Sequence, residues 1–254
     1  MEGRDLYLLP ERRLAPPALP EPAGGMVLVV PGFTPHLAAR IWGADRGPTA
    51  PLIVLVHDWE GQIYDMMPFV QPLLDAGARV VAFDAPAHGR SAGEETHVLD
   101  MVRAIRAVAM AAGGSVTASI AHGLGATALA LAMQEGFDPG RAVLLAPLAD
   151  LMLPVRQIAQ VLRLDTDGEH DLTLAIDQAL GRPLAGLHVR GNAEVPALLI
   201  HSSDDRIMPV ADALHLAAGW PGMAVHLVEG LGHRRLLSDP AVQGLVLGFA
   251  LASA

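Results

Sequence analysis

Continuous apolar runs alternate along the chain with segments in which apolar residues recur at helical spacing. The short runs predict buried strands at residues 51–57, 78–84, 115–121, 141–146, 197–201 and 224–228. The periodic segments predict helices at residues 64–76, 96–112, 124–133, 210–218 and 240–250. This alternation indicates a mostly parallel sheet covered by helices on both faces, which is an α/β fold.

The segment before the first buried run has a different character. Residues 1–24 are rich in Pro and Arg and predict an extended arm on the surface. Residues 26–30 and 36–42 predict the two strands of an antiparallel hairpin that is joined through Pro31-Gly32.

The alternation breaks again between the fourth and fifth buried runs. This segment is polar, with helical patches at residues 151–164 and 172–180 and a turn at 165–168. We interpret it as a small helical cap inserted over the ends of the strands. The predicted organisation is an arm of residues 1–24, a core of residues 25–146 and 193–254, and a cap of residues 147–192.

Composition and charge exclude several classes of function. The net charge of −10 argues against nucleic acid or an anionic membrane as a partner, because both require basic patches. All 17 basic residues are Arg, so catalytic lysines are excluded, and the absence of Cys excludes thiol nucleophiles and disulfides. The expected partner is a small molecule, apolar or ester-like, and the sequence leaves the oligomeric state open.

The chain offers no sign of export or of membrane insertion. Its first residues lack a basic region followed by an apolar run, so we expect no secretory signal. No apolar run approaches the roughly 18 residues that a membrane helix needs. We therefore expect a cytoplasmic protein.

Polar motifs follow the strands, at the edge of the sheet where ligands bind in open α/β folds. They are His57-Asp58-Trp59, the segment from Asp84 to Ser91, Ala121-His122-Gly123-Leu124-Gly125, Asp205-Arg206-Ile207-Met208-Pro209, and Gly232-His233. In this order they resemble the motifs of the α/β-hydrolase superfamily, in particular the small bacterial serine hydrolases with a short helical cap. The resemblance covers roughly residues 25–252.

This resemblance implies a catalytic acid and a catalytic base. Asp205 matches the acid and His233 the base, which fits a carboxylate that orients an imidazole and an imidazole that moves the proton. Asp204 is the competitor for the acid, but the spacing to Pro209 favours Asp205. Trp59 and the Leu124 N–H fall where the family binds the oxyanion.

Two residues depart from the family pattern at one site. Gly123 stands at the nucleophile position, where the family has Ser, so the acyl-enzyme route is lost there and the position is expected to be empty. Asp58 stands where the family has Gly, and a carboxylate beside the oxyanion site opposes a developing negative charge.

Three functions remain open from the sequence. The first is a hydrolase homologue without serine chemistry, inactive or altered, that binds a small apolar ligand under the cap. The second is an enzyme that uses His233 and Asp205, with or without Asp58, for non-covalent acid–base or lyase-type chemistry. The third is an ordinary esterase in which Ser was replaced by Gly123, which the presence of Asp58 disfavours.

Two features of the sequence bear on a cofactor or a metal site. Residues 123–128 match G-x-G-x-x-A between a strand and a helix, as in dinucleotide-binding sites, but several strand–helix units precede this one. The 11 His residues are scattered, without His-x-His or HExxH motifs. We therefore expect neither a cofactor nor a metal.

Overall fold

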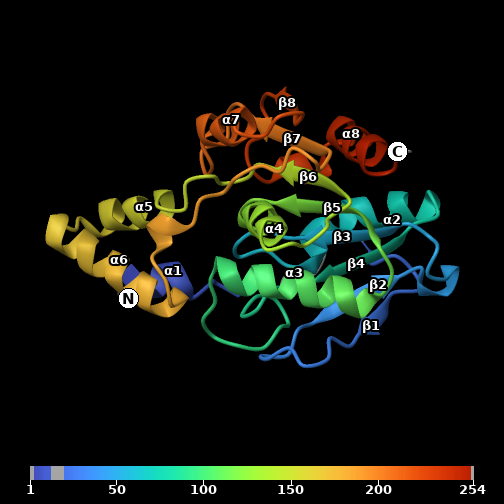
Figure 1. The fold of residues 1–254 in the computed structure, drawn as a ribbon, viewed down its shortest axis with the longest axis horizontal. Helices are drawn as coiled ribbons and strands as arrows, with labels where there is room; N and C mark the ends of the chain where they lie inside the picture. Colours follow the sequence, from blue (N-terminus) through green and yellow to red (C-terminus); the bar gives the residue numbers. More distant parts are fainter. Residues whose placement is uncertain (1–2, 13–19, 253–254) are drawn as a thin grey trace.

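The computed structural model describes residues 3–12 and 20–252, which are built around an eight-stranded sheet (Figure 1). The strands are β1 Met26–Leu28, β2 Ala39–Trp42, β3 Leu52–Val56, β4 Arg79–Phe83, β5 Val116–His122, β6 Arg141–Leu145, β7 Ala197–Ser202 and β8 Ala224–Val228. Their order across the sheet is β1-β2-β4-β3-β5-β6-β7-β8. Strand β2 is antiparallel to both of its neighbours, and β3 to β8 are parallel.

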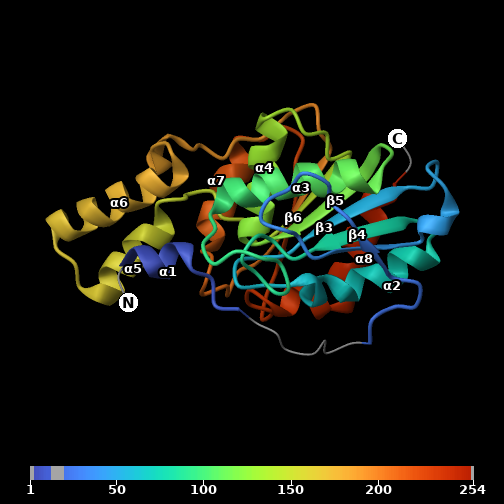
Figure 2. The same cartoon turned by 90° about the horizontal axis from the view of Figure 1, so that it is seen from below.

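Helices cover both faces of this sheet (Figure 2). The α-helices of the described residues are α1 Gly3–Leu8, α2 Met67–Asp75, α3 Val98–Ala112, α4 Leu124–Gln134, α5 Leu153–Leu162, α6 Thr166–Leu180, α7 Val210–Ala218 and α8 Pro240–Ala250. Apolar residues of α3 and α4 form the core on one face, and those of α2 and α8 form it on the other. None of the helices in the described ranges is long and apolar enough to cross a membrane. The predicted α/β fold is confirmed.

Most local boundaries lie within a few residues of the predicted ones, and two of the differences concern where a helix begins. The predicted helix at residues 64–76 begins as a 3-10 turn, η2 Ile63–Met66, before α2. The second helix of the predicted cap segment begins at Thr166, six residues before the predicted start at 172. It starts there because the Asp165 carboxylate accepts a hydrogen bond from the Gly168 N–H, which caps the helix.

The N-terminal residues differ from the predicted extended arm. Residues 3–8 form helix α1, which packs against α5 and α6 rather than lying free on the surface (Figure 1). Leu8 is buried, and Gly3 lies directly against Leu162 of α5 and Leu172 of α6. The prediction of an extended arm is therefore wrong for these residues, because contacts with distant helices stabilise a helix too short to persist alone. Residues 13–19 of that predicted arm lie outside the described residues.

The register of the central strands determines where the polar loops meet. Val56 at the end of β3 pairs with Phe83 of β4 and with Ala121 of β5. The three strands therefore end at the same level, and the loop after β3 lies beside the turn after β5. Helices α1, α5 and α6 gather beyond this edge of the sheet (Figure 1).

Candidate active site

The turn after β5 has the backbone of a sharp strand-to-helix elbow. Gly123 adopts φ 55° and ψ −126°, and its N–H donates to the carbonyl of Leu145. Helix α4 begins at the next residue, Leu124. A residue with a side chain is strained at this positive φ. Glycine therefore avoids backbone strain in the turn, and it also leaves room for a neighbouring side chain.

That neighbour is Asp58, which enters from the loop after β3. Its Oδ1 accepts a hydrogen bond of 2.6 Å from the Leu124 N–H, and its Oδ2 lies 2.9 Å from Nε2 of His233. A Cβ atom added to Gly123 would overlap the Asp58 carboxylate. The expectation of an empty nucleophile position is therefore wrong, because a carboxylate from another strand fills it.

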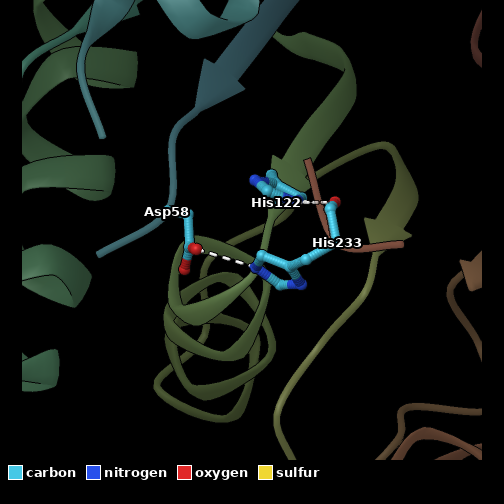
Figure 3. A group of neighbouring side chains, drawn as sticks. All are labelled: Asp58, His122 and His233. Carbon is cyan, nitrogen blue, oxygen red and sulfur yellow. Dashed lines mark hydrogen bonds and ion pairs between the residues drawn. The ribbon is translucent and has the colours of Figure 1, made fainter. Parts of the chain in front are cut away.

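His233 lies between two carboxylates. Its Nδ1 is 2.7 Å from Oδ2 of Asp205, and its Nε2 faces Asp58, as Figure 3 shows for the latter pair. Asp205 is fixed by the N–H groups of Ile207 and Met208, which donate to its Oδ1 at 2.8 and 2.9 Å. The structure thus brings three of the sequence-predicted residues, Asp58, His233 and Asp205, into one hydrogen-bonded row.

The charges in this row stabilise one another. Burial alone would lower the pKa of His233, but its hydrogen bonds to Asp205 and Asp58 and their charges raise it to about 9. Burial opposes ionisation of Asp58, yet the hydrogen bond and charge of His233, with the Leu124 N–H, lower the pKa of this carboxyl. The pKa of Asp205 is also lowered: its bonds to His233 and to backbone N–H groups outweigh burial. At neutral pH the row is therefore carboxylate, imidazolium, carboxylate.

Neighbouring polar residues hold this row in position. His122, at the end of β5, donates from Nε2 to the carbonyl oxygen of His233 at 3.0 Å (Figure 3). His57 donates from Nδ1 to the Asp58 carbonyl and accepts from the Ala85 N–H at Nε2. Burial lowers the pKa of both imidazoles to about 4, so both are neutral at pH 7.

Asp204, the competitor for the acid, has a different set of partners. Its Oδ1 accepts hydrogen bonds from the Ser202 hydroxyl and from the N–H groups of Gly230 and Gly232. These bonds close the loop that carries His233, whereas Asp205 contacts the imidazole itself.

A cavity of about 460 Å³ opens over Asp58. Its lining is mostly apolar and comes from α1, α5 and the loops after the strands. The lining residues are Leu6, Tyr7, Asp58, Trp59, Glu60, His97, Val98, Leu124, Leu148, Pro154, Gln157, Ile158, Val161, Ile207, Met208 and Arg234. The sequence predicts Asp58, Trp59 and Leu124 as site residues, but it gives no signal for Leu6 and Tyr7, because they reach the cavity only through the packing of α1.

Three side chains at this site could hold a metal ion. Asp58, His122 and His233 each offer one ligand atom, and these atoms lie within 4.8 Å of one another. In the described structure Asp58 and His233 are bonded to each other and His122 is bonded to the His233 carbonyl. A metal would have to displace the proton between Asp58 and His233. The absence of a metal stays a prediction.

Two further predictions concern the elbow. The Leu124 N–H, expected to serve as an oxyanion donor, is already bonded to Asp58. In the dinucleotide interpretation the same N–H would face a pyrophosphate, but here it faces a carboxylate whose charge repels phosphate.

Comparison with known proteins defines the class to which this site belongs. Residues 53–188, more than half of the chain, match the model of the alpha/beta hydrolase family. The chain belongs to this family. A search of curated protein sequences finds no significant match.

Solved structures share the fold at low sequence identity. Est1E from Butyrivibrio proteoclasticus, solved with ferulic acid, is 17% identical with a TM-score of 0.67, covering 89% of this chain and 100% of its own. A 2-hydroxy-6-oxo-6-phenylhexa-2,4-dienoate hydrolase from Rhodococcus sp. strain RHA1 is 17% identical with a TM-score of 0.67, covering 90% and 99%. An esterase of Pyrococcus furiosus is 16% identical with a TM-score of 0.67, covering 96% of both chains.

Proposed function

We propose that this chain is an enzyme that acts, without serine chemistry, on a small and mostly apolar molecule bound in the cavity over Asp58. The observation that carries this proposal is the hydrogen-bonded row of Asp58, His233 and Asp205, which reaches that cavity through Asp58. Serine-type acyl transfer is disfavoured twice, because Gly123 has no hydroxyl and because the Leu124 N–H is bonded to Asp58.

The charges of this row favour an enzyme over a vestigial site. The side chain of His233 is 2% exposed and that of Asp205 is fully buried, and burying charged groups is costly. A protein that only needed an apolar pocket could replace these groups by apolar side chains at little cost in stability. Oppositely shifted pKa values in a cavity are instead typical of groups that move protons.

His233 is the acid–base group in this proposal. Protonated at neutral pH, it can donate a proton to a substrate oxygen, and it becomes a base once that proton has gone. Asp205 keeps the imidazole oriented throughout, because its own orientation is fixed by the backbone N–H groups of Ile207 and Met208.

A second candidate is a ligand-binding protein without turnover. It is favoured by the fact that Asp58 and His233 satisfy each other, so that no polar group of the row requires a substrate. The cavity would then bind an apolar ligand against a closed ion pair. The two candidates share the ligand class and differ only in whether the ligand is changed.

Fluorescence of Trp59 offers the test. Trp59 lines the cavity, whereas Trp42 and Trp220 are buried elsewhere at 0% and 1% exposure, so quenching by a ligand reports on this site. Small aryl and alkyl esters, epoxides, alcohols and amides would be titrated, and products measured by chromatography. We expect saturable quenching that Trp59→Phe removes, and turnover that His233→Gln reduces by at least about 10²-fold while quenching persists.

The possible results separate the candidates. Saturable quenching without any product would favour the ligand-binding protein. Quenching that Trp59→Phe leaves unchanged, or no quenching across the panel, would contradict binding in this cavity.

A further inference from the structure

The lining of the cavity over Asp58 includes an arginine, Arg234, that directly follows His233 in the chain. Two carboxylates line the same cavity, but both have other partners. Asp58 is bonded to His233 and to the Leu124 N–H, and Glu60 accepts from the Glu11 N–H. Within residues 3–12 and 20–252, no carboxylate lies within ion-pair distance of the Arg234 guanidinium.

The lack of a partner is unusual for an arginine in this chain. The sequence has 27 acidic residues for 17 arginines, so acidic partners are plentiful. The adjacent Arg235 donates from Nε and Nη2 to the carbonyls of Leu231 and Gly230, and so closes the turn that carries His233. Arg234 makes no such bond in the described structure. Its guanidinium is therefore used neither in an ion pair nor in holding the loop.

Two neutral groups of the lining also have donors to spare. The indole N–H of Trp59 has no acceptor among the described residues. The His97 Nδ1 accepts from the Asp100 N–H, so the neutral ring carries its proton on Nε2, which has no acceptor in the described ranges either. The charged acceptors of the cavity are thus already bonded, whereas several donors are not. A ligand that brings acceptors would satisfy them.

We propose that the ligand of this cavity is a small carboxylate with an apolar body, and that Arg234 determines this specificity by binding the carboxylate group. The inference rests on the proposed function, because it concerns the substrate of the same cavity. It adds the chemical class of that substrate and a binding residue outside the hydrogen-bonded row.

The chemistry of the lining favours a carboxylate over other anions. A guanidinium presents two parallel N–H donors that match the two oxygens of a carboxylate. A phosphate brings up to two charges and usually requires several cationic donors, whereas the lining offers one arginine beside two acidic residues. The mostly apolar remainder of the lining, which includes Ile158 and Val161 of α5, suits a hydrocarbon body.

The negative charge of Asp58 also constrains how such a ligand lies. Asp58 repels a second carboxylate, so the carboxylate of the ligand belongs at Arg234, and the group that reacts is a separate part of the molecule. Arg234 is an exposed residue, which places this anchor at the mouth of the cavity. Binding the charged end at the mouth directs the other end toward Asp58 and His233.

Pairs of acids and their primary amides test the proposal on the full chain. 5-Phenylpentanoate and octanoate, and the amide of each, would be titrated at pH 7.5 with Trp59 fluorescence as the signal. We expect each acid to bind at least about 10-fold more tightly than its amide. Arg234→Gln is expected to remove this preference while the amides bind within about 2-fold of the parent protein, which shows that the variant folds. Arg234→Lys keeps the charge without the paired donors and should retain only part of the preference.

Arg182→Gln is the matched control, because it removes the same charge from an exposed arginine that does not line the cavity. It is expected to leave all four affinities unchanged. An equal loss of acid binding in Arg182→Gln and Arg234→Gln would indicate a general charge effect and contradict a role for Arg234.

Other results would overturn the inference and leave the proposed function standing. Equal affinity for acid and amide, or a preference for the acid that persists in Arg234→Gln, would exclude carboxylate binding by this residue. Binding of neutral esters or alcohols, with no binding of either acid, would exclude the substrate class. Absence of binding by the acids, the amides and every neutral compound would overturn the proposed function as well.

Discussion

Gly123 and Asp58 are coupled residues rather than two separate departures from a hydrolase pattern. Any side chain at Gly123 would collide with the Asp58 carboxylate. That carboxylate also accepts the hydrogen bond of the Leu124 N–H at the start of α4. A carboxylate at this position therefore requires glycine in the elbow. Decay of an unused site would leave the two positions free to vary independently.

Restoring serine tests this coupling. Gly123→Ser alone is expected to lower the free energy of unfolding and to give no esterase activity, because its Cβ meets Asp58. The double variant Gly123→Ser with Asp58→Gly removes the collision and frees the Leu124 N–H. It is expected to hydrolyse p-nitrophenyl butyrate at least about 10²-fold faster than either single variant. Equal activity of Gly123→Ser and the double variant would contradict the coupling.

At the scale of elements, the site depends on the close approach of α4 to the loop after β3. A Cβ atom added to Gly125, in the first turn of α4, would overlap the carbonyl oxygen of His57. His57 precedes Asp58, and its Nδ1–H donates to the Asp58 carbonyl. The spacing between helix and loop therefore sets the distance from the Leu124 N–H to the carboxylate.

A glycine pair tests this spacing. Gly125→Ala is expected to lower the free energy of unfolding by about 1–3 kcal/mol, because the helix must move away from the backbone of His57. Gly244→Ala in α8, where nothing lies within 4 Å of the new Cβ, is the control and is expected to stabilise by up to about 1 kcal/mol. Urea unfolding measures both values. Equal stability of the two variants would contradict the close approach.

At the scale of the whole molecule, buried titratable groups tie stability to pH. His57, His88 and His122 are buried in the neutral form, and burial lowers their pKa values to about 4, 3 and 4. In the unfolded chain these groups take up protons near pH 6.5. His233 has the opposite shift, because its two carboxylate partners outweigh burial and raise its pKa to about 9.

The signs of these shifts predict maximal stability near pH 6.5. As pH falls toward 4, the unfolded chain binds more protons than the folded one at the three neutral histidines, so stability falls. The contribution of His233 is complete below pH 6.5 and is lost as pH rises through about 9. For His57 alone, the free energy of unfolding is expected to fall by about 3 kcal/mol as the pH drops through this range. Urea unfolding at pH 4.5, 6.5 and 9.5 tests this, and equal stability at pH 4.5 and 6.5 would contradict it.

Much of the fold could be predicted because its signals are local. Helices α7 and α8 and strand β8 lie at the predicted residues. They could be predicted because the hydrophobic periodicity of a helix or strand can be recognised within a short stretch of sequence. Helix α1 could not be predicted, because its six residues are helical only in contact with α5 and α6. The same packing brings Tyr7 into the cavity lining, which no local signal indicates.

The sequence by itself determined the alternation of strands and helices, the glycine in the elbow, and the order of Asp58, Asp205 and His233 along the chain. The tertiary structure alone decided that the nucleophile position is filled. Strand register aligns the ends of β3 and β5, and this alignment directs the carboxylate of Asp58 onto Gly123 and His233. The space left by a missing side chain stays empty only if no side chain from another segment fills it. Whether one does is decided by packing between residues far apart in sequence.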